Sequence, residues 1–150
     1  MTVRVTWDAA GAEPPILSEG AVRAAVEASL AHGGRPDTEV DVVFVEDATL
    51  ASMHGEWLGD GSPTDVITFD LGDEFSGPAG ELYVSEACAR RVAGEQGLDP
   101  RREAALYVVH GTLHLCGFDD HEDEERARMR AAEREVLAGL GYDANVPEFE

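Results

Sequence analysis

The chain of 150 residues contains no lysine, only two cysteines and no long apolar run. Two cysteines are too few for a disulfide framework, so we expect Cys88 and Cys116 to be small buried residues without a disulfide. No apolar run approaches the roughly 20 residues that a membrane-spanning helix needs. No basic and then apolar leader precedes the first predicted strand. We therefore expect a cytoplasmic protein that has no membrane partner.

Positive charge is also scarce. The chain has 31 acidic residues against 11 arginines, and its formal net charge is −20. This balance argues against tight, non-specific binding of nucleic acid, because phosphate contacts need local positive charge. One local exception is predicted, where Arg90, Arg91, Arg101 and Arg102 cluster in and between two predicted helices. These arginines form either a basic strip or ordinary solvated helix faces.

The pattern of apolar residues predicts one domain over residues 1–150. With 43% hydrophobic residues, a chain of this length buries a core of its own. Strands are predicted at residues 2–7, 40–45, 65–71 and 81–85. Helices are predicted at residues 19–31, 47–54, 86–96, 100–116 and 122–140. Strands interleaved with helices favour an α/β (α+β) fold, in which a small mixed four-stranded sheet packs with about five helices.

The last predicted helix is strongly charged. We expect Ala127, Ala131, Val136 and Leu137 to form its inward face, with its glutamates and arginines in solvent.

Two histidines in the helix predicted at 100–116 are the strongest chemical signal. His110 and His114 are four residues apart, so they share one face with Cβ atoms roughly 5–6 Å apart. Gly117 then breaks the helix and returns the chain with Asp120 and His121. Three protein ligands with a fourth position left for water are typical of a catalytic zinc site. The pattern indicates a metal-dependent hydrolase with a zinc-hydrolase-like metal helix; the alternative is a pair of hydrogen-bonded core histidines.

The residue after His110 limits which hydrolysis reactions are expected. A zinc peptidase of the H-E-x-x-H kind carries its general base directly after the first histidine. Here that position is Gly111, which accepts no proton. Peptide hydrolysis by that route is therefore not expected.

Three segments together resemble the YbeY family of bacterial endoribonucleases and rRNA maturation factors. HGTLHLCGFD at 110–119 is similar to the family's H-G-x-L-H-L-x-G-Y-D signature. PTDVITF at 63–69 and GELYVS at 80–85 resemble two of its strands, in the expected order. The resemblance implies a small α/β fold, a metal held by three side chains, and cleavage of single-stranded RNA in rRNA maturation and ribosome quality control. It implies rRNA, the ribosomal subunit and ribosomal proteins as partners. If the four clustered arginines form a basic strip, they are possible RNA contacts.

The resemblance carries His110 and His114 over as metal ligands but leaves the third ligand open. The family places a histidine directly after the aspartate of its signature, whereas here Asp120 stands there and His121 follows. Zinc accepts either a ring nitrogen or a carboxylate oxygen. We favour His121, because a one-residue bulge after glycine costs little. One Zn²⁺ per chain suits this set best, and nickel or iron(II) also fits.

A second departure concerns an arginine that the family carries before its T-D-V strand. The matching position is Leu58, and no arginine occurs between Arg35 and Arg90. An arginine there would neutralise developing phosphate charge. His54 is a weak candidate to replace it, or else a surface histidine. The alternative function is therefore a metal-stabilised maturation factor that binds rRNA or ribosomal protein and cuts little or nothing.

Three further residues are weaker candidates. Thr64 and Asp65 either orient a ligand histidine through a hydrogen bond or hold a turn. Glu81 is a possible proton acceptor, or a plain acid at a strand edge. No residue stands out as general base, which leaves the metal-bound water as the reacting group.

Overall fold

The computed structural model describes residues 3–7, 15–58, 66–70, 80–119 and 121–142. It contains four strands, β1 (Val3–Trp7), β2 (Val40–Val45), β3 (Val66–Asp70) and β4 (Gly80–Ser85). Its helices are α1 (Glu19–His32), α2 (Asp47–Leu58), α3 (Glu86–Gln96), α4 (Pro100–Leu115) and α5 (Asp123–Gly139). The predicted α/β fold with a mixed four-stranded sheet and five helices is confirmed. The largest difference in bounds is α2, which runs four residues beyond the predicted end at residue 54.

The strand order is β1-β2-β4-β3, with β1, β2 and β4 parallel and β3 antiparallel to β4. Helices in the connections make the parallel pairs possible, because a parallel crossover needs a dozen or more residues. The α1 helix lies between β1 and β2 in the chain, and α2 lies between β2 and β4. In the antiparallel pair, Thr68 of β3 is opposite Leu82 of β4.

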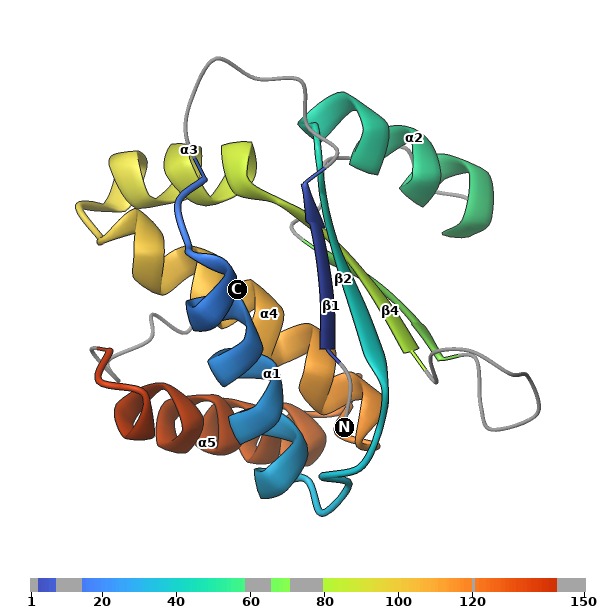
Figure 1. Cartoon of the computed structure of the whole chain (residues 1–150), viewed down its shortest axis with the longest axis vertical. Helices are drawn as coiled ribbons and strands as arrows, with labels where there is room; N and C mark the ends of the chain where they lie inside the picture. The colour runs from blue at the N-terminus through green and yellow to red at the C-terminus, as the bar shows by residue number, and fades with distance from the viewer. Residues whose placement is uncertain (1–2, 8–14, 59–65, 71–79, 120, 143–150) are drawn as a thin grey trace.

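Helices cover both faces of the sheet, with α1, α4 and α5 on one side and α2 on the other (Figure 1). Alternation along the strands supplies both cores. Val42 and Phe44 of β2 belong to the larger core under the first group of helices. Val45 joins Leu50 and Ile67 in a smaller core under α2. This two-sided burial explains the nearly continuous apolar run in β2.

The α4 helix is the centre of the helical layer. It contacts α1, α3, α5, β3 and β4. Twelve of its 16 residues are buried, so it is surrounded on nearly all sides. The Asp99 side chain caps its start by accepting from the backbone N–H of Arg101, and Pro100 occupies the first turn. The fold thus holds α4 rigidly from several directions.

Gly111 lies where α4 comes closest to the sheet. A Cβ at this position would be 2.8 Å from Leu82 Cδ2 and 3.0 Å from Thr68 Oγ1. The Thr68 hydroxyl donates to the Gly111 carbonyl at 3.4 Å. Gly111, which stands where a zinc peptidase has its general base, is therefore required for close packing of α4 on the sheet.

We expect Gly111→Ala to lower the free energy of unfolding by about 1–3 kcal/mol, because the added methyl overpacks the contact with Leu82. Gly94→Ala is the matched control, since Gly94 is an exposed helical glycine whose Cβ would meet nothing within 4 Å. That variant should gain about 0.4–1 kcal/mol. Urea unfolding measures both, and equal effects of the two variants would contradict the packing argument.

The end of α4 is fixed by a glycine and an arginine. Gly117 has φ +97°, and the Phe118 N–H donates to the Leu113 carbonyl at 3.1 Å, as in a Schellman motif. The Arg35 guanidinium donates to the Leu115 carbonyl at 2.7 Å. The helix break predicted at Gly117 is confirmed, and it turns the chain back toward α5.

The predicted inward face of α5 is partly wrong. Val136 and Leu137 are buried, but Ala127 and Ala131 are exposed. The buried positions are Met129, Ala132, Glu133, Val136 and Leu137. These follow the spacing of three and four residues that defines one helical face, from which positions 127 and 131 are rotated away.

No helix within the described ranges is both long enough and apolar enough to cross a membrane. The two cysteines are free, which confirms the absence of a disulfide.

Candidate functional site: a histidine pair on the central helix

The structure brings His110 and His114 together on the half-buried side of α4. Their Nε2 atoms are 3.1 Å apart, and their ring centroids are 4.6 Å apart with the planes nearly perpendicular. Nearly all their neighbours on α4 face the core, so the two rings occupy the part of the helix that solvent reaches.

A buried carboxylate from α5 orients one of these rings. His110 Nδ1 lies 2.5 Å from Glu133 Oε2, and the Glu133 side chain is fully buried. The Arg130 guanidinium donates to the other carboxylate oxygen at 2.8 Å. A carboxylate paired with arginine accepts hydrogen bonds, so the His110 proton lies on Nδ1. The lone pair of His110 Nε2 is left facing His114.

The pair fits a metal ion. In a tetrahedral site with Zn–N distances of about 2.0–2.1 Å, two ligand nitrogens are about 3.3 Å apart. The 3.1 Å between the Nε2 atoms of His110 and His114 is close to this separation. A ligand histidine whose other nitrogen donates to a carboxylate is the usual arrangement around zinc, and Glu133 supplies that carboxylate here.

Among the described residues, no third predicted ligand joins the pair. Asp120 lies outside the described residues. His121 is exposed, and its Nε2 lies 3.2 Å from Asp119 Oδ1. Over the described ranges, no group of three histidine, cysteine, aspartate or glutamate side chains could hold a metal. Cys116 packs against Gly33, and burial raises the pKa of its thiol, which disfavours the thiolate that metals bind.

Glu81, predicted as a possible proton acceptor, lies on the other side of the sheet. Leu82 faces Gly111 of α4, so its neighbours Glu81 and Tyr83 face the opposite way. The Tyr83 hydroxyl donates to Glu81 at 3.3 Å. Burial, and then the charge of Glu81, raise the Tyr83 pKa. Glu81 is therefore not placed to act beside the histidines, a correction that follows from strand alternation.

Four other predicted residues fall outside what the structure describes. Thr64 and Asp65 are not among the described residues. His54 and Leu58 belong to α2, but their side chains are not described.

The four arginines of the predicted basic strip already have interaction partners within the protein. The Arg102 guanidinium is 3% exposed and donates to the buried Glu103 at 3.1 Å, so its prediction as an RNA contact is wrong. Arg101 pairs with Asp99 at 3.5 Å, and Arg90 and Arg91 have partners of their own. Arg102 also lies eight positions before His110 in α4, roughly 12 Å along the helix axis.

Sequence reasoning missed Glu133 and Arg130. The available signal was the position of Glu133 between Met129, Ala132 and Val136, which puts a charged residue on the apolar face of α5. A charge at such a position needs a buried partner, here Arg130 together with His110.

Comparison with known proteins identifies the family and agrees with the fold. A sequence model of the family described as Endoribonuclease YbeY matches residues 16–141. A Pelotomaculum thermopropionicum protein named Endoribonuclease YbeY is 41% identical over 125 residues, covering 79% of this chain and 82% of that protein. One of the same name from Azorhizobium caulinodans is 37% identical over 131 residues, covering 85% and 82%.

A solution structure from Thermotoga maritima is similar in fold. Its TM-score is 0.61 at 23% identity, over 92% of this chain and 91% of that one. From the family match and the identity over most of its length, the chain belongs to the endoribonuclease YbeY family.

Proposed function

We propose that this protein is a metal-dependent endoribonuclease that cuts single-stranded RNA during rRNA maturation and ribosome quality control. Its relatives carry the name endoribonuclease. The observation that carries the metal dependence is the histidine pair, with Nε2 atoms 3.1 Å apart and His110 held by the buried Glu133. We expect the protein to act in the cytoplasm, where its RNA partners are.

The geometry suggests a different role for each residue of the site. A bound Zn²⁺ would lower the pKa of a water to about 7 and stabilise negative charge on the phosphate in the transition state. His110 and His114 would hold the ion through Nε2. Glu133 keeps the His110 proton on Nδ1, away from the metal side. Gly111 keeps the helix seated on the sheet and takes no part in proton transfer.

For the third ligand we propose His121, with Asp120 as the alternative. We expect His121→Ala to lose bound zinc and Asp120→Ala to retain it, since a ring nitrogen completes a three-nitrogen site. Zinc per chain, measured by elemental analysis after dialysis, decides between them. If His121→Ala retains one zinc and Asp120→Ala loses it, the carboxylate is the ligand.

Leu58 favours a second candidate function, because it stands where the family carries an arginine. Without that positive charge, the transition state loses a stabilising contact worth several kcal/mol. The protein would then act as a maturation factor that binds rRNA or ribosomal protein with little cleavage.

The test is cleavage of a single-stranded rRNA fragment by the purified protein, with and without a chelator. Under the nuclease proposal the fragment is cut, the chelator stops the reaction, added zinc restores it, and the same sequence as a duplex is resistant. Absence of cleavage combined with co-sedimentation on ribosomal subunits would favour the maturation factor.

A further inference from the structure

One arginine stands apart from the rest in this acidic chain. All eleven arginines lie within the described ranges, and in that part of the chain only Arg128 has no hydrogen-bonding, ionic or aromatic partner. Its neighbour on α5, Arg126, pairs with Asp123 at 3.1 Å. In a protein with a net charge of −20 and no lysine, an exposed guanidinium that has no partner among the described residues is available to bind an anion.

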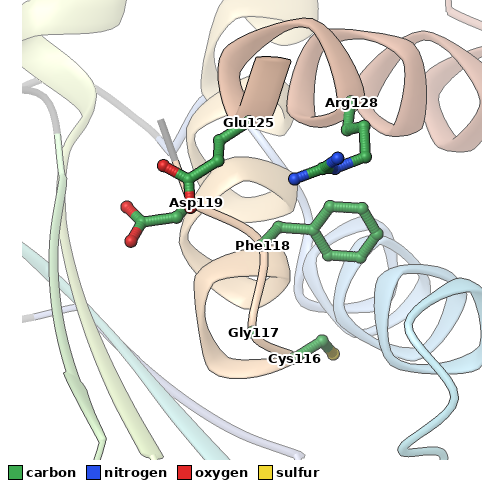
Figure 2. Close-up of a pocket in the computed structure, with 6 residues that line it drawn as sticks. All are labelled: Cys116, Gly117, Phe118, Asp119, Glu125 and Arg128. Carbon is green, nitrogen blue, oxygen red and sulfur yellow. The ribbon is translucent and has the colours of Figure 1, made fainter. Parts of the chain in front are cut away.

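Arg128 reaches over a pocket at the turn between α4 and α5. Figure 2 shows the Arg128 side chain extending from α5 toward the ring of Phe118. The pocket is open and is lined by Cys116, Gly117, Phe118, Asp119, Glu125 and Arg128. Phe118 is half-buried, so it packs on the core and still presents part of its ring to the pocket.

The two carboxylates of the pocket are already engaged. Asp119 pairs with His121 at 3.2 Å. Glu125 accepts from the Glu122 backbone N–H at 3.1 Å, as part of the capping box that begins α5. Neither carboxylate forms an ion pair with Arg128. The pocket therefore combines an aromatic surface with one positive charge that no described carboxylate pairs with.

An aromatic ring beside an arginine is the chemistry that binds single-stranded nucleic acid, because every base stacks on a ring and every nucleotide carries a phosphate. The pocket also lies near the histidine pair in the chain. Phe118 follows His114 by four residues, and Arg128 precedes Glu133 by five on the same helix. Arg128 and Glu133 are thus about 7.5 Å apart along the axis of α5.

We propose that this pocket binds one unpaired nucleotide of a single-stranded RNA, with its base on Phe118 and its phosphate on Arg128. The proposal rests on the proposed function, since it names a contact for the RNA that the histidine pair would cut. It also replaces the predicted arginine strip with a smaller site built on another helix.

The experiment measures binding of a fluorescein-labelled single-stranded oligoadenylate by anisotropy, at several salt concentrations and with a chelator present. We expect Arg128→Gln to weaken binding about tenfold and to reduce the slope of log affinity against log salt by about 0.7, the value for one phosphate contact on a single strand. Phe118→Leu keeps the apolar contact but removes the ring, and we expect about a tenfold loss as well. Arg126→Gln is the matched control and should bind like the wild type.

A second probe reports the stacking itself. An oligoadenylate containing 2-aminopurine should lose fluorescence when its base stacks on Phe118, and this change should be absent with Phe118→Leu. Thermal unfolding of each variant shows whether the fold is kept.

The outcomes separate this pocket from the proposed function. If the wild type binds RNA and Arg128→Gln binds it with the same affinity, the pocket proposal is overturned and the nuclease proposal stands. The same holds if Arg126→Gln loses as much affinity as Arg128→Gln. Normal 2-aminopurine quenching by Phe118→Leu would also overturn it. A wild type that binds no RNA at low salt overturns both.

Discussion

His114→Ala is expected to lose bound zinc and to cut single-stranded RNA about a thousandfold more slowly, a loss of several kcal/mol in transition-state stabilisation. The reason is geometric, because removing one imidazole leaves a lone His110 Nε2 facing solvent. The fold should survive, since His114 is only half-buried and its ring contacts solvent. Zinc content and single-turnover cleavage measure the two losses.

The matched control for this variant is His32→Ala. His32 also lies in the last turn of a helix and is partly exposed, with Nδ1 3.6 Å from the exposed carboxylate of Glu135. It should keep its zinc, and zinc content is the comparison it controls, because its ring lies 6.2 Å from that of Phe118 in the proposed RNA pocket. If His114→Ala retains wild-type cleavage, the histidine pair is not the reactive centre.

Substitution of Glu133 is expected to have the second large effect. Two substitutions separate its role in zinc binding from its role in stability. Glu133→Gln keeps the shape but removes the charge, and we expect zinc affinity to fall about 10–100-fold because His110 is no longer held by a carboxylate. Glu133→Leu removes the carboxylate that accepts from the Arg130 guanidinium, which is 11% exposed. Breaking a buried pair in this way should cost about 3–5 kcal/mol of the free energy of unfolding.

Zinc affinity is measured by competition with a chromophoric chelator, and stability by urea unfolding of the metal-free protein. Glu135→Gln serves as control, because Glu135 lies on the same helix but is 73% exposed. It should change neither quantity. Wild-type zinc affinity in Glu133→Gln would show that Glu133 serves the fold alone.

The sequence predicted the helices and strands well because their signals are local. Asp99 and Pro100 mark the start of α4, and Gly117 marks its end. Strand order and direction are different, since they depend on pairs such as Thr68 and Leu82 that are distant in sequence. The resemblance to a known family supplied the fold class, which local patterns left between α/β and α+β.

Only the part of the site whose geometry follows from residue spacing along one helix could be predicted. The interval between His110 and His114 places both rings on one face of α4, and the structure brings their Nε2 atoms together. Glu133, which orients His110, lies on another helix, so local spacing does not predict the contact. Alanines occur on several sides of α5, so the apolar pattern did not show which face is buried. Pairing of the arginines could not be predicted either, because it depends on which carboxylates the fold brings near them.

The histidines lie on α4, the helix that contacts three other helices and two strands of the described fold. A segment held from so many sides does not open by local fluctuation, so its backbone amides should exchange with solvent only when the whole domain unfolds. An ion bound to such a helix stabilises the entire native state by mass action, rather than one loop. Loss of the ion would then lower the stability of the whole domain and leave the metal-free protein folded.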